Sequence, residues 1–532
     1  PMGSVEGKGQ PTVINGVFGF MQHNSLTDGI YVEDGTIVNT ADAIVIYKAA
    51  NGDYYFDNAE LNSENGVLFQ MIDNDDDSRV GMISMAEGFS TEYDEEKVSG
   101  EIGFPGITYD YESKAGGNTV SATYTNGDYE GNIYNGTGYY GQAGDDLFVT
   151  VGEGATLTGD IALTSTIKGV PYSPEAVEGI AYYGDDIGYV FLDAEGNECD
   201  EADAAFIQIR SYTINEYFLQ GHVQNLPYYN GTSTLDVTVK AGAEWKVTGT
   251  SLITSLTVED GAKVYGELVK NADGSLTLTA SDETLAAGTY GTIEAIGGGQ
   301  NVGGGVTDDG TLDVEAAAGA IAVGGSTAAS GEPSGEASAE PASEAVTADI
   351  ADMEPSEYEY LTNYANRKTP GMIYVGNDET GTADIALNDT VTGEGYTAVY
   401  AHGEDADVTV SGTLTILDES EGENTSDFSG QGSATVAYDD ANLTLKDLTY
   451  YSTGFERGVA VVSENSLVTI EDSDITVMGN DPLTNAWEGY HSSADQNYMI
   501  SPPWPLGITG GGRILNMIGT TPKLTILNST LV

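Results

Sequence analysis

Short runs that alternate branched apolar residues with threonine recur along the chain, each followed by a turn that contains Gly, Asp or Asn. Residues 235–239, 255–258, 443–445 and 468–470 are clear examples. Alternation with a period of two places one set of side chains on one face of a β-strand. The chain is therefore expected to fold into many short strands.

The interval between these runs predicts how the strands stack. Val237 and Val258 are 21 residues apart, Val258 and Leu278 are 20 apart, and Leu445 and Ile470 are 25 apart. This interval matches one coil of a β-solenoid. We predict an all-β right-handed parallel β-helix, a single continuous stack with a disordered internal linker. A β-sandwich is the alternative, but Asn-Gly hairpin turns do not dominate the sequence.

Asp or Asn recurs where the predicted strands turn a corner. Three runs carry Asp447, Asp474 and Asn528 between apolar residues. Both residue types adopt the left-handed backbone conformation more readily than other non-glycine residues. These positions are therefore predicted to bend the chain between two faces of the solenoid.

The composition divides the chain into four parts. Residues 1–4 resemble a vector-derived scar, and residues 296–355 are rich in Gly, Ala, Ser, Glu and Pro. Such a segment buries too little apolar surface to fold, so it is predicted to be a linker. Residues 5–295 and 356–532 are predicted to be β-helix coils.

The strand pattern runs to Val532 without a polar cap. Solenoid ends normally need a cap, because unpaired strand edges associate. We therefore predict a circularly permuted order, in which residues 356–532 form the N-terminal half of the solenoid and residues 5–295 form the C-terminal half.

The charge balance limits the partners. The chain has 84 Asp and Glu residues against 17 Lys and Arg residues, for a net charge of −67. Such a charge repels nucleic acid and anionic membranes. Neutral glycans, proteins and divalent cations remain as partners. The single cysteine, Cys199, excludes an intrachain disulfide, and no apolar run is long enough to cross a bilayer.

Two segments resemble a known family. They are residues 501–530, with Pro-Pro-Trp and Gly-Gly-Gly-Arg blocks, and residues 66–75, with a Met-Ile-Asp-Asn-Asp block; the run at residues 245–258 looks like the end of the family's solenoid. They resemble large secreted β-helix proteins of clostridial bacteria, which have a pectate-lyase-like fold, are regarded as adhesin-like and lack an agreed activity. In that family the Pro-Pro-Trp block comes first, which is the reverse of the order here and favours permutation. The resemblance implies an extracellular, cell-surface protein of a Gram-positive bacterium.

An acidic cluster at residues 73–77 is the candidate metal site. Its carboxylates are Asp73, Asp75, Asp76 and Asp77. Calcium takes six to eight oxygen ligands, and a cation relieves the repulsion among adjacent carboxylates. The spacing of a regular calcium loop is absent, so a solvated acidic loop is the alternative. No cofactor is therefore expected to be required, and calcium is the one ion for which the sequence offers a candidate site.

Aromatic residues crowd the segment 481–513, which is too long for a tight corner. The candidate ligand-binding residues are Trp487, Tyr490, His491, Tyr498, Trp504 and Arg513. Long insertions on a solenoid often carry its binding loops, and aromatic faces suit sugars and proteins. A glycan or protein ligand at the cell surface is therefore expected, and the open solenoid end favours end-to-end self-association.

Catalysis is the alternative function. A polysaccharide lyase or glycoside hydrolase of the β-helix type needs converging acids, and a lyase needs a basic residue beside calcium. No catalytic residue is identified, since Asp439 and Asp440, the adjacent acids just before a strand, are expected to face water. Ice binding by threonine rows is a further alternative, although the threonine positions vary between runs.

Overall fold

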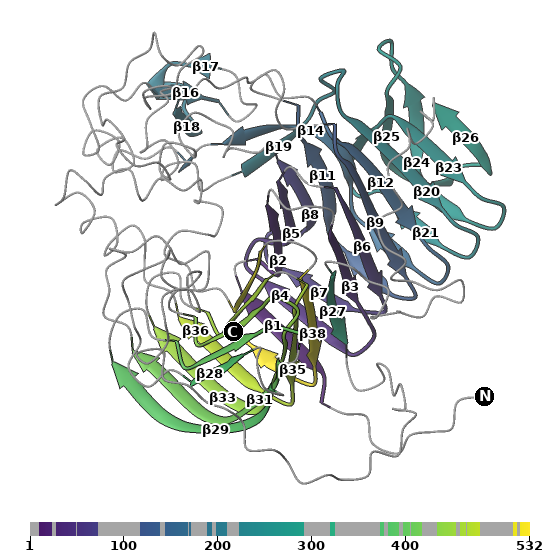
Figure 1. Cartoon of the computed structure of the whole chain (residues 1–532). Helices are drawn as coiled ribbons and strands as arrows, with labels where there is room; N and C mark the ends of the chain where they lie inside the picture. The colour runs from purple at the N-terminus through teal and green to yellow at the C-terminus, as the bar shows by residue number, and fades with distance from the viewer. Residues whose placement is uncertain are drawn as a thin grey trace.

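The computed structural model describes residues 10–16, 18–23, 28–48, 51–72, 117–138, 144–168, 170–171, 189–193, 198–209, 223–291, 320–324, 373–376, 381–392, 397–404, 406–417, 433–453, 458–463, 465–478, 514–518 and 522–532. These residues form an all-β protein with parallel sheets, and their one helical element is a 3₁₀ turn at Glu201–Asp203 (Figure 1).

An 18-stranded sheet, called the main sheet, contains strands from both ends of the chain. Its strands are β1 (Thr12–Gly16), β3 (Asp28–Val32), β4 (Thr36–Thr40), β6 (Gly52–Asp57), β7 (Glu60–Ser63), β9 (Thr119–Thr125), β12 (Asp146–Val151), β20 (Thr234–Val239), β23 (Ser255–Val258), β26 (Gly288–Gly291), β27 (Ala320–Gly324), β29 (Gly381–Thr392), β31 (Ala406–Leu417), β33 (Asn442–Thr453), β35 (Leu467–Glu471), β36 (Asp474–Met478), β38 (Lys523–Leu527) and β39 (Thr530–Leu531).

Four smaller sheets contain the other strands. The β28–β37 sheet has β28 (Ile373–Gly376), β30 (Val399–His402), β32 (Thr435–Tyr438), β34 (Ala460–Ser463) and β37 (Leu515–Ile518). The β2–β19 sheet has β2 (Phe20–His23), β5 (Ala43–Lys48), β8 (Val67–Ile72), β11 (Asn132–Gly136), β14 (Ile161–Lys168) and β19 (Val223–Pro227). The β10–β25 sheet has β10 (Asp128–Glu130), β13 (Thr156–Thr158), β21 (Glu244–Lys246), β22 (Thr250–Ile253), β24 (Lys263–Lys270) and β25 (Leu276–Thr284). A small antiparallel sheet has β15 (Val170–Pro171), β16 (Tyr189–Leu192), β17 (Glu198–Cys199) and β18 (Phe206–Ile209).

Most of the strands pair in parallel with the equivalent strand one repeat away. Leu445 pairs with Ile470, as their spacing predicts. Val258 pairs with Val239, so the repeat there is 19 residues. The predicted 21-residue interval, which placed Val258 opposite Val237, was wrong. Leu278 lies in β25, which pairs antiparallel with β22 and β24 and therefore does not continue the parallel repeat. The predominance of parallel pairing differs from the hairpins of a β-sandwich.

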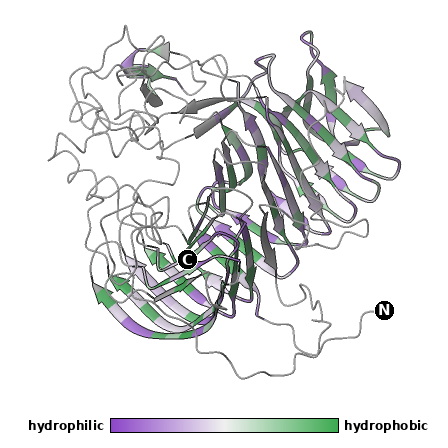
Figure 2. Cartoon of the chain, in the orientation of Figure 1, coloured by the Kyte–Doolittle hydropathy of each residue, from purple (hydrophilic) through white to green (hydrophobic). Residues whose placement is uncertain are grey.

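The alternating sequence pattern decides which side chains enter the core. In β9, Val120, Ala122 and Tyr124 are buried and the residues between them are half-exposed. Apolar and polar positions alternate in a similar way along many of the other strands (Figure 2), whereas strands such as β8 are buried throughout. One cluster of buried residues extends from Ile14 to Leu531, so both ends of the chain share a core.

Left-handed residues turn the corners. Asp447 and Asn528 have φ values of 52° and 50°, which confirms the prediction for these positions. In the third run the corner residue is Asp472, with a φ of 50°, and Asp474 instead begins β36. The prediction for Asp474 was wrong by two residues, because a buried serine, Ser473, follows the corner and directs its hydroxyl to the backbone.

The two ends of the chain meet in the main sheet. Val13 of β1 pairs in parallel with Thr530 of β39, and the yellow-green C-terminal strands therefore lie beside the purple N-terminal ones (Figure 1).

A strand lies inside the segment predicted to be a linker. β27 pairs in parallel with both β38 and β3. The prediction that residues 296–355 contain no packed structure was therefore wrong for this part. Ile321 and Val323 repeat the alternating pattern among small residues, and this is sufficient for a strand when two ordered neighbours supply the backbone hydrogen bonds.

Candidate functional site

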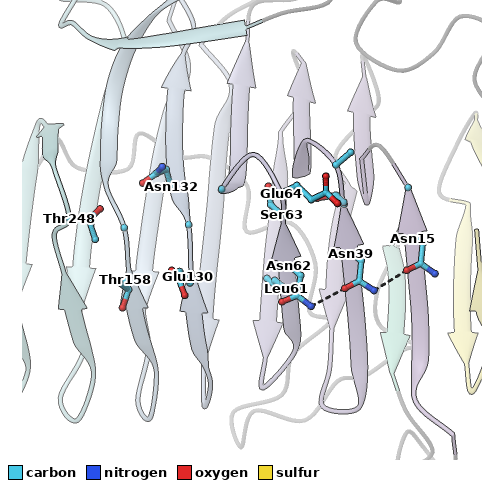
Figure 3. A pocket seen from close by; sticks show the side chains of 16 residues that line it. Asn15, Asn39, Leu61, Asn62, Ser63, Glu64, Glu130, Asn132, Thr158 and Thr248 are labelled. Atoms are coloured by element: carbon cyan, nitrogen blue, oxygen red, sulfur yellow. Dashed lines mark hydrogen bonds between the residues drawn. The ribbon is translucent and has the colours of Figure 1, made fainter.

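A polar groove crosses the corners that follow β1, β4, β7, β10 and β13. Its volume is about 950 Å³, and it is lined by Asn15, Gly16, Asn39, Thr40, Ala41, Leu61, Asn62, Ser63, Glu64, Gly66, Glu130, Gly131, Asn132, Thr158, Gly159 and Thr248 (Figure 3). Amides, hydroxyls and backbone supply most of its polar groups, apolar surface contributes as well, and no Lys or Arg lines it. Such groups exchange hydrogen bonds with uncharged polar ligands.

Three asparagines stack to form an amide ladder along the groove. Parallel register places Asn15 beside Asn39 and Asn39 beside Asn62. The Nδ2 of Asn39 donates to the Oδ1 of Asn15, and the Nδ2 of Asn62 donates to the Oδ1 of Asn39, both at 2.9 Å (Figure 3). The bonds all run in one direction, so the ladder ends in the donor Nδ2 of Asn15 and the acceptor Oδ1 of Asn62.

The groove opens where the strand pairing changes. β7 pairs with β4, whereas β10 belongs to another sheet and pairs with β13. At this point the backbones of neighbouring corners are joined by isolated hydrogen bonds, such as the 2.8 Å hydrogen bond from the amide of Asn132 to the carbonyl of Gly66. This change of sheet exposes polar backbone and side chains that a continuous sheet would cover.

Glycines allow successive corners to approach closely below the groove. A Cβ on Gly131 would lie 3.1 Å from the carbonyl oxygen of Gly66, and a Cβ on Gly159 would lie 2.6 Å from the carbonyl carbon of Gly131. The amide of Gly159 donates to the carbonyl of Lys246 at 3.0 Å. The wall of the groove therefore depends on the absence of side chains at these positions.

Two carboxylates reach the groove from different elements. Glu64 follows β7 and Glu130 ends β10, and both are exposed. Figure 3 shows that they do not converge. The described carboxyl groups with raised pKa values are Glu33, Asp53 and Asp145, and none of them lines the groove. The described residues of the groove thus do not include converging acids with shifted pKa values of the kind that a hydrolase site requires.

Asp145 anchors a buried polar network outside the groove. Its Oδ1 accepts bonds from the backbone amide and the Nδ2 of Asn118 at 2.9 and 3.0 Å, and its Oδ2 accepts a 3.1 Å bond from the hydroxyl of Tyr47. Burial raises the pKa of Asp145 to about 6, although these hydrogen bonds act in the opposite direction. The network links the start of β12 to β5 and to the residue before β9, which is a structural role.

The substitution Asp145→Asn is expected to remove a pH dependence of stability. The folded-state pKa of about 6 exceeds the ordinary value of 3.8. The folded protein with a protonated Asp145 is therefore fully stable below pH 4, and this part of the free energy of unfolding is lost as the pH rises through 6. The loss is at most about 3 kcal/mol. The variant should therefore gain stability relative to the natural chain between pH 4 and pH 7.5, measured by urea unfolding at both values. An equal difference at both pH values would contradict the assignment.

A row of outward threonines crosses the main sheet. The pairings align Thr409, Thr444, Thr469 and Thr525 on successive strands, and likewise Thr123, Thr150, Thr238, Thr257 and Thr289. Between the two sets the same register position is taken by Ala322, Tyr31 and Tyr55, of which Tyr31 is buried. Threonine therefore recurs at one register position in two sets of strands, and other residue types occupy that position in β29, β27, β3 and β6, in line with the expected variation between runs. The row is one residue wide, and Asp53, Asp236, Lys446 and Glu471 lie beside it, which gives little support to ice binding.

The predicted site residues lie outside the described part of the chain. These are Trp487, Tyr490, His491, Tyr498, Trp504 and Arg513 for the ligand, and Asp73, Asp75, Asp76 and Asp77 for calcium. Among the described residues, no group of three or more His, Cys, Asp or Glu side chains could hold a metal ion. Asp439 and Asp440 are exposed turn residues with φ values of 59° and 65°.

Sequence reasoning missed the groove, although a signal was present. An asparagine is the second-to-last residue of each of three strands, and the three are spaced by 24 and 23 residues. That spacing equals the strand repeat, so it predicts stacked amides once the register is known.

No family model, curated protein or solved structure matches the chain. The described residues include no helix that is long and apolar enough to span a membrane.

Proposed function

We propose that the protein is an extracellular, non-catalytic, adhesin-like surface module that binds neutral glycans in the polar groove. The observation that carries this proposal is the amide ladder, which ends in an unused donor at Asn15 and an unused acceptor at Asn62, in a groove whose opposite end carries the hydroxyls of Thr158 and Thr248. Sugar hydroxyl groups both donate and accept hydrogen bonds, so they match such a lining.

The proposed scaffold is a right-handed parallel β-helix of the pectate-lyase-like type. Parallel strands that pair at intervals such as 19 and 25 residues support it. The pairing of β39 with β1 supports a permuted order, in which the C-terminal strands precede the N-terminal ones along the stack. A clostridial, Gram-positive origin and a cell-surface location remain proposals based on the sequence resemblance.

The charge of the protein favours neutral over acidic glycans. A net charge of −67 repels polyanionic chains, and Glu64 and Glu130 lie in the groove itself. An acidic polysaccharide would therefore need a bridging cation. Calcium at Asp73, Asp75, Asp76 and Asp77 and a second ligand surface at residues 481–513 belong to the same proposal.

Asn39→Asp tests the groove. The carboxylate has no hydrogen to donate to Asn15 and adds negative charge in the middle of the ladder. Affinity for a neutral polysaccharide should fall at least tenfold, or about 1.4 kcal/mol, as measured by affinity electrophoresis. Asn65→Asp is the matched control, because Asn65 is exposed, donates to Asp42 at 2.9 Å and does not line the groove. Equal losses in both variants would point to charge alone and would count against the groove.

Cleavage of a polysaccharide by a glycoside hydrolase or lyase reaction is the second candidate function, because two carboxylates line the groove. The substitutions Glu64→Gln and Glu130→Gln separate the two candidates. Binding should persist in both variants if the carboxylates are not catalytic, and any polysaccharide cleavage that they abolish would favour an enzyme.

A further inference from the structure

The register of the main sheet continues the amide ladder beyond the groove. β1 pairs in parallel with β39, and this register, carried one position further, places Val532 beside Asn15. Val532 lies opposite Thr476 of β36, because its amide and its carbonyl bond to the residues on either side of Thr476, at 2.9 and 2.8 Å. Thr476 pairs with Tyr451 of β33. One row of outward side chains, whose first part is the amide ladder (Figure 3), therefore leads from the groove to Tyr451.

Tyr451 is an exposed aromatic residue in this row. It is 39% exposed, whereas the preceding Tyr450 is buried and donates from its hydroxyl to the carbonyl of Gly458 at 3.2 Å. Strand alternation thus places one of two consecutive tyrosines in the core and the other on the surface. Met478 of β36 pairs with Thr453, which lies two positions after Tyr451, and is 48% exposed. Tyr451 and Met478 are therefore diagonal neighbours and form an exposed apolar patch beside the row.

The row joins this apolar patch to the polar ladder without a charged side chain. Val532 and Thr476 are the residues between Asn15 and Tyr451, and both side chains are short and uncharged. Neighbouring strands are about 4.8 Å apart, so the row extends about 24 Å from Asn62 to Tyr451. The three amides alone extend about 10 Å. The row thus offers hydrogen-bonding groups at one end and an aromatic ring at the other.

We propose that the ligand is a linear, neutral, β-1,4-linked polysaccharide that lies across the strands along this row and places one sugar ring on Tyr451. The inference rests on the proposed glycan-binding function and names the class of glycan. Such a chain is extended, with hydroxyl groups along its edges and C–H groups on the faces of its rings. The edges match the amides and the faces match the aromatic ring. A coiled or highly branched glycan would not reach both ends of the row.

The length of the oligosaccharide tests how far the site extends. One pyranose unit of an extended chain is close in length to one strand spacing, so about six units cover the row and about three cover the amide ladder. Glucose and mannose oligomers with β-1,4 links, from about two to about eight units, would be titrated into the full chain by calorimetry. Affinity should rise with length up to about six units. A plateau at about three units would overturn the inference.

Tyr451→Thr removes the aromatic ring and keeps a residue that suits the strand. Its neighbours in the row, Thr415 and Thr476, are already threonines. Affinity for the longest oligomer should fall about fivefold, which is the size of one stacking contact, and affinity for the trimer should not change. Tyr451→Phe should bind like the natural chain. Tyr228→Thr is the matched control, because Tyr228 is 54% exposed and lies outside both the groove and the row.

The outcomes separate this inference from the proposed function. If Asn39→Asp weakens binding of the trimer while Tyr451→Thr leaves every oligomer unaffected, the groove proposal stands and the inference is overturned. Equal losses in Tyr451→Thr and Tyr228→Thr would also overturn it. Absence of binding by every oligomer would overturn it as well, and retention of other neutral polysaccharides would then show that the groove still binds glycan. A dimer of the natural chain that Tyr451→Thr dissociates would assign the patch to a second copy and contradict the inference.

Discussion

Replacing Trp245 with alanine should lower the free energy of unfolding by about 3–5 kcal/mol. Trp245 lies in β21, is fully buried, and is one of the largest buried side chains in the protein. Its indole Nε1 donates to the carbonyl oxygen of Gly159 at 3.0 Å. The substitution therefore leaves a large cavity and an unpaired carbonyl below the groove.

Trp245→Phe separates the two contributions. Phenylalanine keeps most of the buried volume and loses the hydrogen bond, so the loss should be smaller, about 1–3 kcal/mol. Urea unfolding followed by circular dichroism gives both values. If the alanine variant were no less stable than the phenylalanine variant, the packing assigned to Trp245 would be wrong.

Gly159→Ala should destabilise the protein by about 3 kcal/mol and distort the groove. The added Cβ would overlap the carbonyl group of Gly131, which is backbone and cannot move without shifting the neighbouring corner. The φ of Gly159 is 153°, which also disfavours a side chain. Glycan affinity should fall in the same variant, because Gly131 and Gly159 both line the groove.

Gly261→Ala is the control for the backbone effect. Gly261 has a φ of 90°, but a Cβ there would have no heavy atom within 4 Å. The substitution should lower the free energy of unfolding by about 1–2 kcal/mol, because alanine disfavours the left-handed backbone conformation. Glycan binding should be unchanged. Equal destabilisation by the two substitutions would show that the close approach of Gly159 to Gly131 is not a real constraint.

The local features of the fold were predictable because they depend on residues close in sequence. Alternating runs such as residues 443–445 became strands, and Asp447 and Asn528 took the left-handed corner conformation. Asp474 was misassigned because Asp472 lies two residues away and either could have formed the corner. The choice depends on Ser473, whose hydroxyl accepts the amide of Leu448 at 3.1 Å from the repeat before.

Features that join distant segments could not be predicted from local patterns. The run of residues 320–324 is too short and too small to indicate a strand by itself, and it is ordered by pairing with β38 and β3. The end of the parallel repeat at Leu278 was missed for the same reason, since apolar alternation does not distinguish parallel from antiparallel pairing.

The candidate site was only partly accessible to sequence reasoning. A dense acidic cluster and an aromatic loop attract attention as short motifs, and both fall outside the described residues. The groove instead consists of common residues from corners that are far apart in sequence, such as Asn15, Glu130 and Thr248. Their proximity depends on the register between repeats and on the change of sheet between β7 and β10.

The central claim is that the groove binds neutral glycan without cleaving it. The most direct measurement incubates the natural chain and the Asn39→Asp variant with a panel of neutral and acidic polysaccharides, with and without calcium, and scores retention and new chain ends. The account predicts retention on neutral polysaccharides, weaker in the variant, with no new chain ends. New chain ends, or retention that Asn39→Asp leaves unchanged, would contradict it.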